Sequence, residues 1–422
     1  MYLSRHLILM TLLLCMITTN SHAQTPSRVN CDSVFDPSAT QNYLDTAFVG
    51  QIVFSDISDA PIHLTFLNGR ERVEQPELRS GMLMGYYASF SPDGRYMFNF
   101  PSSEQNSLTI LEISTGEAVA IMLQEDEVTA LTELNPYPPA NNPSFIHQRL
   151  EWVSSTEFVI RRLDLEISVG PVFLFKQSFN VTSAPLSVIR GKRVDFVLDQ
   201  PHIDGSSNVY NFYSPTIKYL VQMGFVEQVD PLFRLIRVVD TYTQEVLITL
   251  FPTGDSDFSA AYLWDTDEQS LFVKKQNYDP ALGIETSALH QIDFTVSPPQ
   301  LTTQMWDDIE RLFDGDVELA DGDFMPTLSP NGDKIAFKVR RAGEYRNYYL
   351  ISYDLSTREV AAVCDSQLSP SNFIQTFWSP DERYVGYFDD TRHVLVVMDT
   401  QEATIYSLPL TENDQQFLGW VP

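Results

Sequence analysis

The chain has 422 residues, of which 43% are hydrophobic and 12% aromatic, and its 27 basic and 56 acidic residues give a formal net charge of −29. This apolar content supports a packed core and excludes a wholly disordered chain. The acidity argues against nucleic acid and anionic membranes as partners, because both bind basic surfaces. A chain of this length forms several ordinary domains or one large repeat array.

The N-terminus has the pattern of an export signal. Arg5 comes before the apolar run Leu7–Ile17, and Ser21-His22-Ala23 then places small residues on both sides of a histidine. This order predicts a secretory signal peptide over residues 1–23, cleaved near Ala23–Gln24. We expect a secreted or periplasmic protein without a transmembrane segment, because no later stretch approaches about 18 apolar residues in succession. The strong negative charge favours a soluble monomer.

A short phrase recurs along the rest of the chain, in which an aromatic or apolar residue precedes Ser-Pro and a turn residue. The clear copies are Phe90–Gly94, Leu328–Gly332 and Trp378–Glu382, and Tyr213–Thr216 is a degenerate copy. With weaker copies and the last tryptophan, the first position of the phrase forms a column: Phe90, Trp152, Tyr213, Trp264, Leu328, Trp378 and Trp420. Such spacing along a chain is the signature of a repeat architecture.

Each phrase is followed by a short run of β-branched and aromatic residues, such as Tyr96–Phe100, which predicts a strand. Ser-Pro-Asp-Gly between two such runs predicts a tight hairpin. A second turn pattern, acid-x-x-Thr-x-Glu, occurs at Glu112–Glu117, Asp240–Glu245 and Asp354–Glu359, with apolar strands on both sides. The unit therefore has four antiparallel strands, as in a β-propeller blade.

The two ends of the chain match two halves of one unit. Val49–Phe54 resembles the strand that follows the turn, and Gln416–Pro422 resembles the strand that precedes it. Pairing the ends would close the ring and remove free sheet edges. We predict an all-β fold: one seven-bladed β-propeller over residues 49–422 with four-stranded antiparallel blades, after an N-terminal lead over residues 24–48, with six or eight blades as alternatives.

The Ser-Pro-Asp-Gly hairpin and the strand after it, as in Phe90–Phe100, resemble the TolB-type WD-repeat-like β-propeller family of exported bacterial proteins. The resemblance covers nearly all of the mature chain and is carried by three close copies of the turn. The Gly-His pair of true WD repeats is absent. The resemblance implies the propeller fold, but the family's functions are diverse and no catalytic residue is carried over. A partner-binding scaffold is then an expectation by analogy of fold.

The sequence shows no Gly-x-Ser-x-Gly, His-Glu-x-x-His or phosphate-loop motif. Its densest group of hard oxygen ligands makes Ca²⁺ the one cofactor to consider, with Asp314, Asp316, Asp321 and Asp323 as candidate ligands. The spacing of a calcium hand fails, because a loop that starts at Asp314 has Leu319 at its sixth position and Met325 at its twelfth. The alternative is a solvated connector with a short helix, Met305–Phe313.

Loop lengths point to one face of the propeller. Turns after the first and third strands are short, whereas the connections after the second and fourth strands are long and gather on the opposite face: 124–144, 190–211, 277–286, 305–323 and 340–346. Binding residues concentrate on loops held by a rigid scaffold. The candidate binding residues on this long-loop face are Tyr137, Arg190, Lys192, Arg193, His202, Asp204, Trp306, Arg340, Arg341, Tyr345 and Arg346. The alternative is that the basic residues pair with nearby acids.

Two functions from different classes remain open, with a purely structural role as a third. The first is an exported binding module that docks a protein, peptide or glycan partner on the long-loop face. The alternative is a propeller enzyme, a metal-dependent hydrolase or lyase, whose site lies at the central channel. Such an enzyme needs His, Asp or Glu residues that converge at the channel mouth.

Signal cleavage leaves Cys31 and Cys364 as the only cysteines of the mature chain. Two thiols in an oxidising compartment predict a disulfide. The alternative is that Cys364 packs as a small apolar residue and Cys31 stays a free thiol in the lead.

Overall fold

A computed structural model shows the strands of the protein, many of the turns between them and one connecting helix. It describes residues 50–55, 64–68, 71–74, 89–91, 93–99, 107–124, 150–161, 171–199, 206–214, 216, 218–226, 234–251, 256–265, 267–279, 284–320, 326–343, 348–365, 376–389, 394–410 and 416–421. The predicted signal peptide, residues 1–23, and the predicted lead, residues 24–48, lie outside these ranges.

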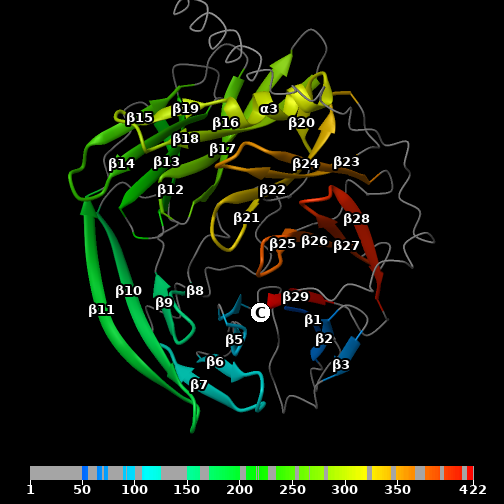
Figure 1. Ribbon diagram of the computed structural model, residues 1–422. Coiled ribbons are helices and arrows are strands. Elements are labelled where there is room, and N and C mark those ends of the chain that lie inside the picture. The colour runs from blue at the N-terminus through cyan, green and yellow to red at the C-terminus, as the bar shows by residue number, and fades with distance from the viewer. Residues whose placement is uncertain are drawn as a thin grey trace, which may run out of the picture.

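The structure is all-β, and its strands form antiparallel sheets built mainly from strands that are consecutive in the sequence. Figure 1 shows the sheets following one another in chain order around a ring. This is the arrangement of a β-propeller, in which each sheet is a meander that packs against its neighbours. Among the described residues, no helix has the length and apolar character needed to cross a membrane.

One sheet contains both ends of the described chain. It is formed by β29 (Gln416–Val421), β1 (Gln51–Ser55), β2 (Leu64–Asn68) and β3 (Glu71–Glu74), in this order. Trp420 of β29 is the register partner of Ile52 in β1, and β29 therefore occupies the position that the first strand takes in the other sheets.

The next three sheets follow the repeat phrases. They consist of β4 (Ser89–Phe90), β5 (Tyr96–Asn99), β6 (Ser107–Glu112) and β7 (Ala118–Met122); β8 (Leu150–Trp152), β9 (Glu157–Arg161), β10 (Pro171–Thr182) and β11 (Ser187–Asp199); and β12 (Ser206–Tyr213), β13 (Tyr219–Val226), β14 (Arg234–Asp240) and β15 (Val246–Leu250).

The remaining sheets complete the described chain. They consist of β16 (Ser256–Trp264), β17 (Ser270–Asp279), β18 (Ile284–Asp293) and β19 (Gln300–Thr302); β20 (Val317–Leu319), β21 (Thr327–Leu328), β22 (Lys334–Arg341), β23 (Tyr348–Asp354) and β24 (Val360–Asp365); and β25 (Thr376–Trp378), β26 (Tyr384–Asp389), β27 (Val394–Asp399) and β28 (Thr404–Pro409). The predicted column, Phe90 to Trp420, lies in the first strand of six sheets. The exception is Leu328, which lies in β21; there both β20 and β21 pair with β22, so this sheet has five strands and not the predicted four.

A buried serine closes the turn after the first strand. Its Oγ accepts a hydrogen bond from the backbone N–H five residues later, at 2.9 to 3.1 Å: Ser91 from Tyr96, Ser214 from Tyr219, Ser329 from Lys334 and Ser379 from Tyr384. Each of these serines is at most 2% exposed. A buried hydroxyl needs a partner, and here it ties the turn to the next strand. The repeated Ser-Pro phrase is thus explained by folding.

The second recurring turn is closed by its acid. The Oδ1 atoms of Asp240, Asp354 and Asp399 each accept hydrogen bonds from two backbone N–H groups, two and three residues later. The residue four positions after the acid is left-handed in each turn, with φ of 60° at Gln244 and 65° at Arg358. The acid-x-x-Thr-x-Glu pattern is therefore a turn signature.

Helix α3 (Gln304–Phe313) connects β19 to β20, where the sequence predicts a helix over Met305–Phe313. The predicted short helix is confirmed, and Asp307, Asp314 and Asp316 of the connector are exposed, but the other side of the helix is buried in a large core cluster. Trp306 stacks on Phe337 with ring centroids 6.4 Å apart, and the edge of Phe313 meets Tyr349 at 4.6 Å. The helix thus packs against the sheet that follows it.

Two of the predicted long connections are mostly strand. The segment 190–211 is largely β11 and β12, and 277–286 is shortened by the ends of β17 and β18. Arg340 and Arg341 likewise end β22. The glycine and basic residues of Arg190–Arg193 have the composition of a loop, but a bulge accommodates them inside a strand.

Candidate functional site

A row of aromatic side chains crosses the sheet β8–β11 from its inner to its outer strand. Trp152, Phe158 and Phe179 are successive register partners, and their neighbouring ring centroids lie 5.4 and 4.9 Å apart. The row packs against Tyr96 and Phe98 of the preceding sheet. Its rings bury the apolar surface that holds two neighbouring sheets together.

Arg190 of β11 ends this row. It is the register partner of Phe179, and its guanidinium carbon lies 5.0 Å from the centre of that ring. Its Nη2 donates to the backbone oxygen of Met122, the last residue of β7, at 3.1 Å. A cation over an aromatic face is attracted by the ring quadrupole. Arg190 is therefore held in place at the outer edge of the ring, between β7 and β11.

A β-bulge in β11 brings a second arginine to the same side. Gln177 opposes Arg193 and Phe179 opposes Arg190, so that a two-residue step along β10 faces a three-residue step along β11. Since Gln177 and Phe179 are alternate residues of a strand, both arginines point to one face. Arg193 Nη1 donates to Oε1 of Gln124, just beyond β7, at 3.0 Å.

Two side chains hold the bulge. The Nε2 of the buried Gln177 donates to the backbone oxygen of Gly191, and Ser178 Oγ donates to the backbone oxygen of Lys192. A Cβ at Gly191 would lie 2.4 Å from Ser178 Oγ, which is closer than real Cβ contacts. Any other residue at position 191 would therefore displace the Ser178 hydroxyl from its bond to Lys192, so the glycine supports the bulge.

Two apolar side chains on the same two outer strands are exposed, and strand alternation turns Ile189 to the face of β11 opposite Arg190. Met122 is 70% exposed and Ile189 is 58% exposed, and Lys192 is exposed between the two arginines. We call the set Met122, Ile189, Arg190, Lys192 and Arg193 the rim patch. It contains the predicted site residues Arg190, Lys192 and Arg193, which lie on a strand and not on a loop.

Other predicted binding residues have structural roles or lie outside the described ranges. Trp306 is 4% exposed, and its Nε1 donates to Oε1 of Glu310 at 3.0 Å. Arg340 is 6% exposed, and its Nε donates to Oε1 of the buried Glu318 at 2.6 Å. Arg341 lies over the ring of Phe313. The residues outside the described ranges are Tyr137, His202, Asp204, Tyr345 and Arg346.

Asp308 of α3 joins the helix to the turn between β23 and β24. Arg358 donates to both of its carboxylate oxygens, at 2.9 and 2.7 Å, and Tyr353 donates its hydroxyl at 3.0 Å. Burial alone would raise the pKa of Asp308, but the hydrogen bonds outweigh it and hold that pKa below its usual value. Burial and this carboxylate raise the pKa of Tyr353 to about 12. The Arg358–Asp308 pair is therefore a link between elements.

The predicted calcium ligands are only partly described. Asp314 is the left-handed C-cap residue of α3, and Asp316 precedes β20. Asp321 and Asp323 lie outside the described residues. Among the residues that the structure describes, no group of three or more His, Cys, Asp or Glu side chains could hold a metal ion.

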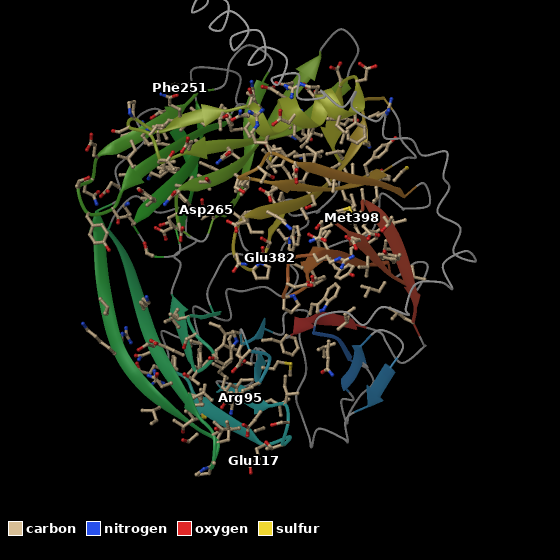
Figure 2. The ribbon with its side chains drawn as sticks, viewed as in Figure 1. Arg95, Glu117, Phe251, Asp265, Glu382 and Met398 are labelled. Atoms are coloured by element: carbon tan, nitrogen blue, oxygen red, sulfur yellow. The ribbon has the colours of Figure 1, made fainter. Side chains whose placement is uncertain are left out.

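Acidic side chains on the tight turns bind neighbouring turns. The carboxylate of Glu268 accepts hydrogen bonds from the backbone N–H and the hydroxyl of Thr216, and that of Glu382 accepts one from the backbone N–H of Asn331. Figure 2 shows Glu382 toward the middle of the ring and Glu117 at its outer edge. These carboxylates join one sheet to the next.

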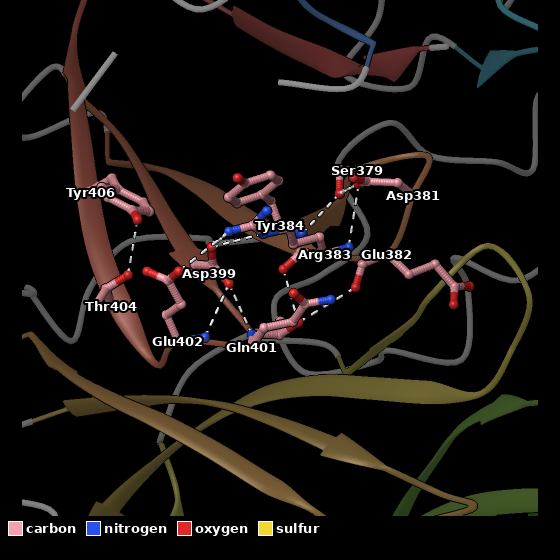
Figure 3. A network of polar contacts seen from close by, with 11 residues as sticks. Ser379, Asp381, Glu382, Arg383, Tyr384, Asp399, Gln401, Glu402, Thr404 and Tyr406 are labelled. Carbon is pink, nitrogen blue, oxygen red and sulfur yellow. Dashed lines mark hydrogen bonds and ion pairs between the residues drawn. The ribbon is translucent and has the colours of Figure 1, made fainter. Parts of the chain in front are cut away.

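The last turn pair shows how such acids are used. Arg383 donates to Oδ2 of Asp399, which is fully buried, through Nε at 2.9 Å and Nη2 at 2.6 Å. Oδ1 of the same carboxylate accepts the backbone N–H groups of Gln401 and Glu402 (Figure 3). Both carboxylate oxygens of Asp399 therefore accept hydrogen bonds from the residues of these two turns.

Cys364 in β24 is part of a disulfide. Its partner lies outside the described residues, as does Cys31, so the pairing of Cys31 with Cys364 stays a prediction.

The rim patch and the side chains that hold its bulge include residues that the sequence did not single out. Met122 ends a strand that reads as ordinary alternation, and Gln177 and Ser178 look like surface residues of β10. The available signal is Gly191, because a glycine inside a strand marks a bulge or a close approach.

Comparisons with known proteins add little. No family model matches the chain, and no curated protein matches it. Among solved structures, a putative 6-phosphogluconolactonase from Bacteroides fragilis is 11% identical with a TM-score of 0.40, covering 90% of this chain and 98% of that one. The periplasmic gluconolactonase of Pseudomonas aeruginosa is 11% identical with a TM-score of 0.39, covering 89% and 99%.

A third similar structure is the β-propeller domain of Cps50 (Swd1) from Myceliophteria thermophila. It is 11% identical with a TM-score of 0.32, covering 87% of this chain and 97% of that one. At these values the likenesses carry no argument beyond what the topology of the chain itself shows.

Proposed function

We propose that the protein is an exported binding scaffold that docks a protein, peptide or glycan partner at the rim patch. The observation that carries the proposal is the outer edge formed by β7 and β11, where Met122 and Ile189 are exposed and a bulge holds the strand segment that contains three cations. Interfaces are enriched in methionine and arginine.

The scaffold in this proposal is a closed ring of seven blades. The pairing of β29 with β1 and the order of the sheets support it. Export rests on the signal pattern of residues 1–23, and the TolB-type likeness rests on the three close Ser-Pro turns. On the predicted long-loop face, Trp306 and Arg340 are buried and therefore cannot contact a partner.

Site-specific photo-crosslinking tests the docking site. A photo-reactive residue in place of Ile189 should give a discrete crosslinked product in the exporting cell. The matched control is Val296, which is 40% exposed on the turn between β18 and β19. Products that are absent at Ile189, or equal at both positions, would overturn the proposal.

The alternative is a metal-dependent hydrolase or lyase with its site at the central channel. It is distinguished by a stoichiometric metal in the purified protein and by the absence of a specific crosslink at Ile189.

A further inference from the structure

We infer that Asn331, in the turn between β21 and β22, is a site of spontaneous deamidation, and that the carboxylate formed there loosens the contact between this turn and the sheet β25–β28. The site is not part of the rim patch and needs no bound partner. Three features of the turn carry the inference: the glycine after Asn331, the exposure of the asparagine and the acidic side chains around it.

The residues at the tip of the turn favour the reaction. Gly332 follows Asn331, and a glycine has no side chain to hinder attack by its own backbone nitrogen. Asn331 is exposed, so water has access to its amide. The sequence contains one other Asn-Gly pair, Asn68-Gly69, whose glycine lies outside the described residues. The turn at Asn331 is therefore the place where the structure can be used to examine this chemistry.

The reaction needs water as its only co-reactant. The backbone nitrogen of Gly332 forms a bond to Cγ of Asn331, the bond from Cγ to the side-chain nitrogen breaks, and this nitrogen leaves as ammonia with the proton of the Gly332 N–H. Water then opens the cyclic imide and leaves aspartate or isoaspartate at position 331. In the native turn the Gly332 N–H donates to the backbone oxygen of Ser329 at 2.9 Å, so the turn has to open locally before the nitrogen can attack.

The other two clear copies of the turn indicate why this position holds an amide. There the residue is an aspartate, Asp93 or Asp381, and its Oδ1 accepts hydrogen bonds from the serine hydroxyl two residues before it and from the backbone N–H of an arginine two residues after it. The residue two positions after Asn331 is Asp333. A carboxylate at position 331 would therefore meet a like charge where the other turns have a cation.

Glu382 brings a further carboxylate to the same turn. It accepts a hydrogen bond from the backbone N–H of Asn331, it is 7% exposed, and it belongs to the turn between β25 and β26 of the next sheet. Lys334 Nζ donates to the backbone oxygen of Glu382 at 3.0 Å. Deamidation adds a negative charge between Glu382 and Asp333, and like charges this close in the chain destabilise the fold. The isoaspartate product also lengthens the main chain of the turn.

Peptide mapping of the full mature protein after incubation in mildly alkaline buffer tests the chemistry. We expect aspartate and isoaspartate to accumulate at position 331, more slowly than in the same protein unfolded in guanidinium chloride, because the native turn has to open first. Asn331→Gln should abolish the product, since its amide would have to close a larger ring. A residue 331 that stays asparagine in the native protein while the unfolded chain converts, or conversion at Asn68 alone, would overturn the inference.

Asn331→Asp imitates the charge of the product and tests its consequence. We expect the thermal midpoint to fall by about 1–2 °C, and hydrogen exchange at the N–H of residue 331 to become about threefold faster. In the background of Asp333→Arg, which has the charge order of the other two turns, the same substitution should cost nothing. An equal loss in both backgrounds, or no loss in the natural one, would overturn the loosening of the contact.

The two experiments separate the modification from its effect. If residue 331 converts while Asn331→Asp leaves the midpoint and the exchange rate unchanged, the deamidation site stands and its effect on the contact is wrong. If the variant is destabilised while residue 331 never converts, the charges of the turn are as described but the site is wrong. Mapping of the unaltered protein remains decisive even where a variant fails to fold.

Discussion

Glu268 and Glu382 occupy positions where the repeated turn otherwise has glycine. Both have left-handed backbones, with φ of 56° and 58°, whereas Gly94 and Gly332 fill the same place in two other turns. A side chain in this conformation costs roughly 1–2 kcal/mol. Each glutamate uses the position to reach the backbone N–H of the preceding sheet's turn, on Thr216 or Asn331. The strain is thus offset by a contact between sheets.

The balance between backbone strain and the hydrogen bond to the neighbouring turn can be measured at Glu382. Glu382→Ala keeps the strain and loses the hydrogen bond to Asn331, so we expect the free energy of unfolding to fall by about 1–3 kcal/mol. Glu382→Gly loses the same bond but relieves the backbone, and should be about 1 kcal/mol more stable than the alanine variant. Urea unfolding measures both. Equal stability of the two variants would show that backbone strain at position 382 has no measurable effect on stability, and that only the hydrogen bond of the carboxylate matters.

His290 of β18 is a buried titratable group without a catalytic assignment. It is 8% exposed, and its Nδ1 has no hydrogen-bond partner among the described residues. Burial, with a contribution from the charge of Lys275, lowers the pKa of His290 to about 4, while Asp307 of α3 acts in the opposite direction. Between pH 6.5 and about pH 4, this imidazole is therefore neutral in the native state but protonated in the unfolded chain.

The consequence is a loss of stability in mild acid. The unfolded state binds a proton near pH 6.5 and the native state only near pH 4, so stability is complete above 6.5 and declines as the pH falls toward 4. The decline is at most about 1.4 kcal/mol per pH unit. His290→Leu should flatten the difference between urea midpoints at pH 6.5 and 4.5. An unchanged slope in this variant would contradict a neutral buried His290.

Among the elements, β29 has the largest consequence for the ring. It is formed by the C-terminal residues, yet it pairs with β1, and Ile52 and Val53 of β1 are fully buried. Trp420 stacks on Tyr384 of the neighbouring sheet with ring centroids 6.1 Å apart. The strand therefore contributes backbone pairing to one sheet and an aromatic contact to the next.

Deleting Phe417–Pro422 should then cost far more than a loss of terminal residues. We expect the thermal midpoint to fall by more than about 5 °C, because the edge of β1 and its apolar residues become exposed. Deleting Pro422 alone, which follows the strand, is the matched control. A midpoint within a degree or two of the full chain would show that β29 does not hold the ring.

The strands and turns were predictable because each repeat has a local signal. Trp152 and Trp378 mark the ends of the first strands of their sheets. The acids of the second recurring turn mark the points where those turns begin. Both patterns arise from backbone geometry. The packing of α3 was missed, although Met305, Trp306, Ile309 and Phe313 recur at the spacing of one helix face and indicate a buried side; the acids between them drew attention to solvent instead. The bulge at Gly191 was also missed, since it depends on Gln177 and Ser178 of the paired strand, which no local pattern links to it.

At the scale of the whole molecule, the disulfide of Cys364 ties the ring to residues beyond the described strands. Cys364 lies in β24, at the outer edge of its sheet, and its register partner is Tyr349 in β23. If residues 1–23 are removed on export, Cys31 is the only cysteine left to pair with it. The bond would then close a loop that spans most of the propeller.

We therefore predict a Cys31–Cys364 disulfide in the exported protein, with the lead fastened against the outer strand of that sheet. In the chain-entropy model, so large a loop stabilises the native state by up to about 5 kcal/mol. Cys31→Ser should lower the thermal midpoint, and a reducing agent should lower the midpoint of the natural chain to the same value but leave the variant unchanged. Non-reducing peptide mapping should recover the two cysteine peptides as one species. Two thiols that are alkylated without reduction would contradict the pairing, because a bonded cysteine cannot react.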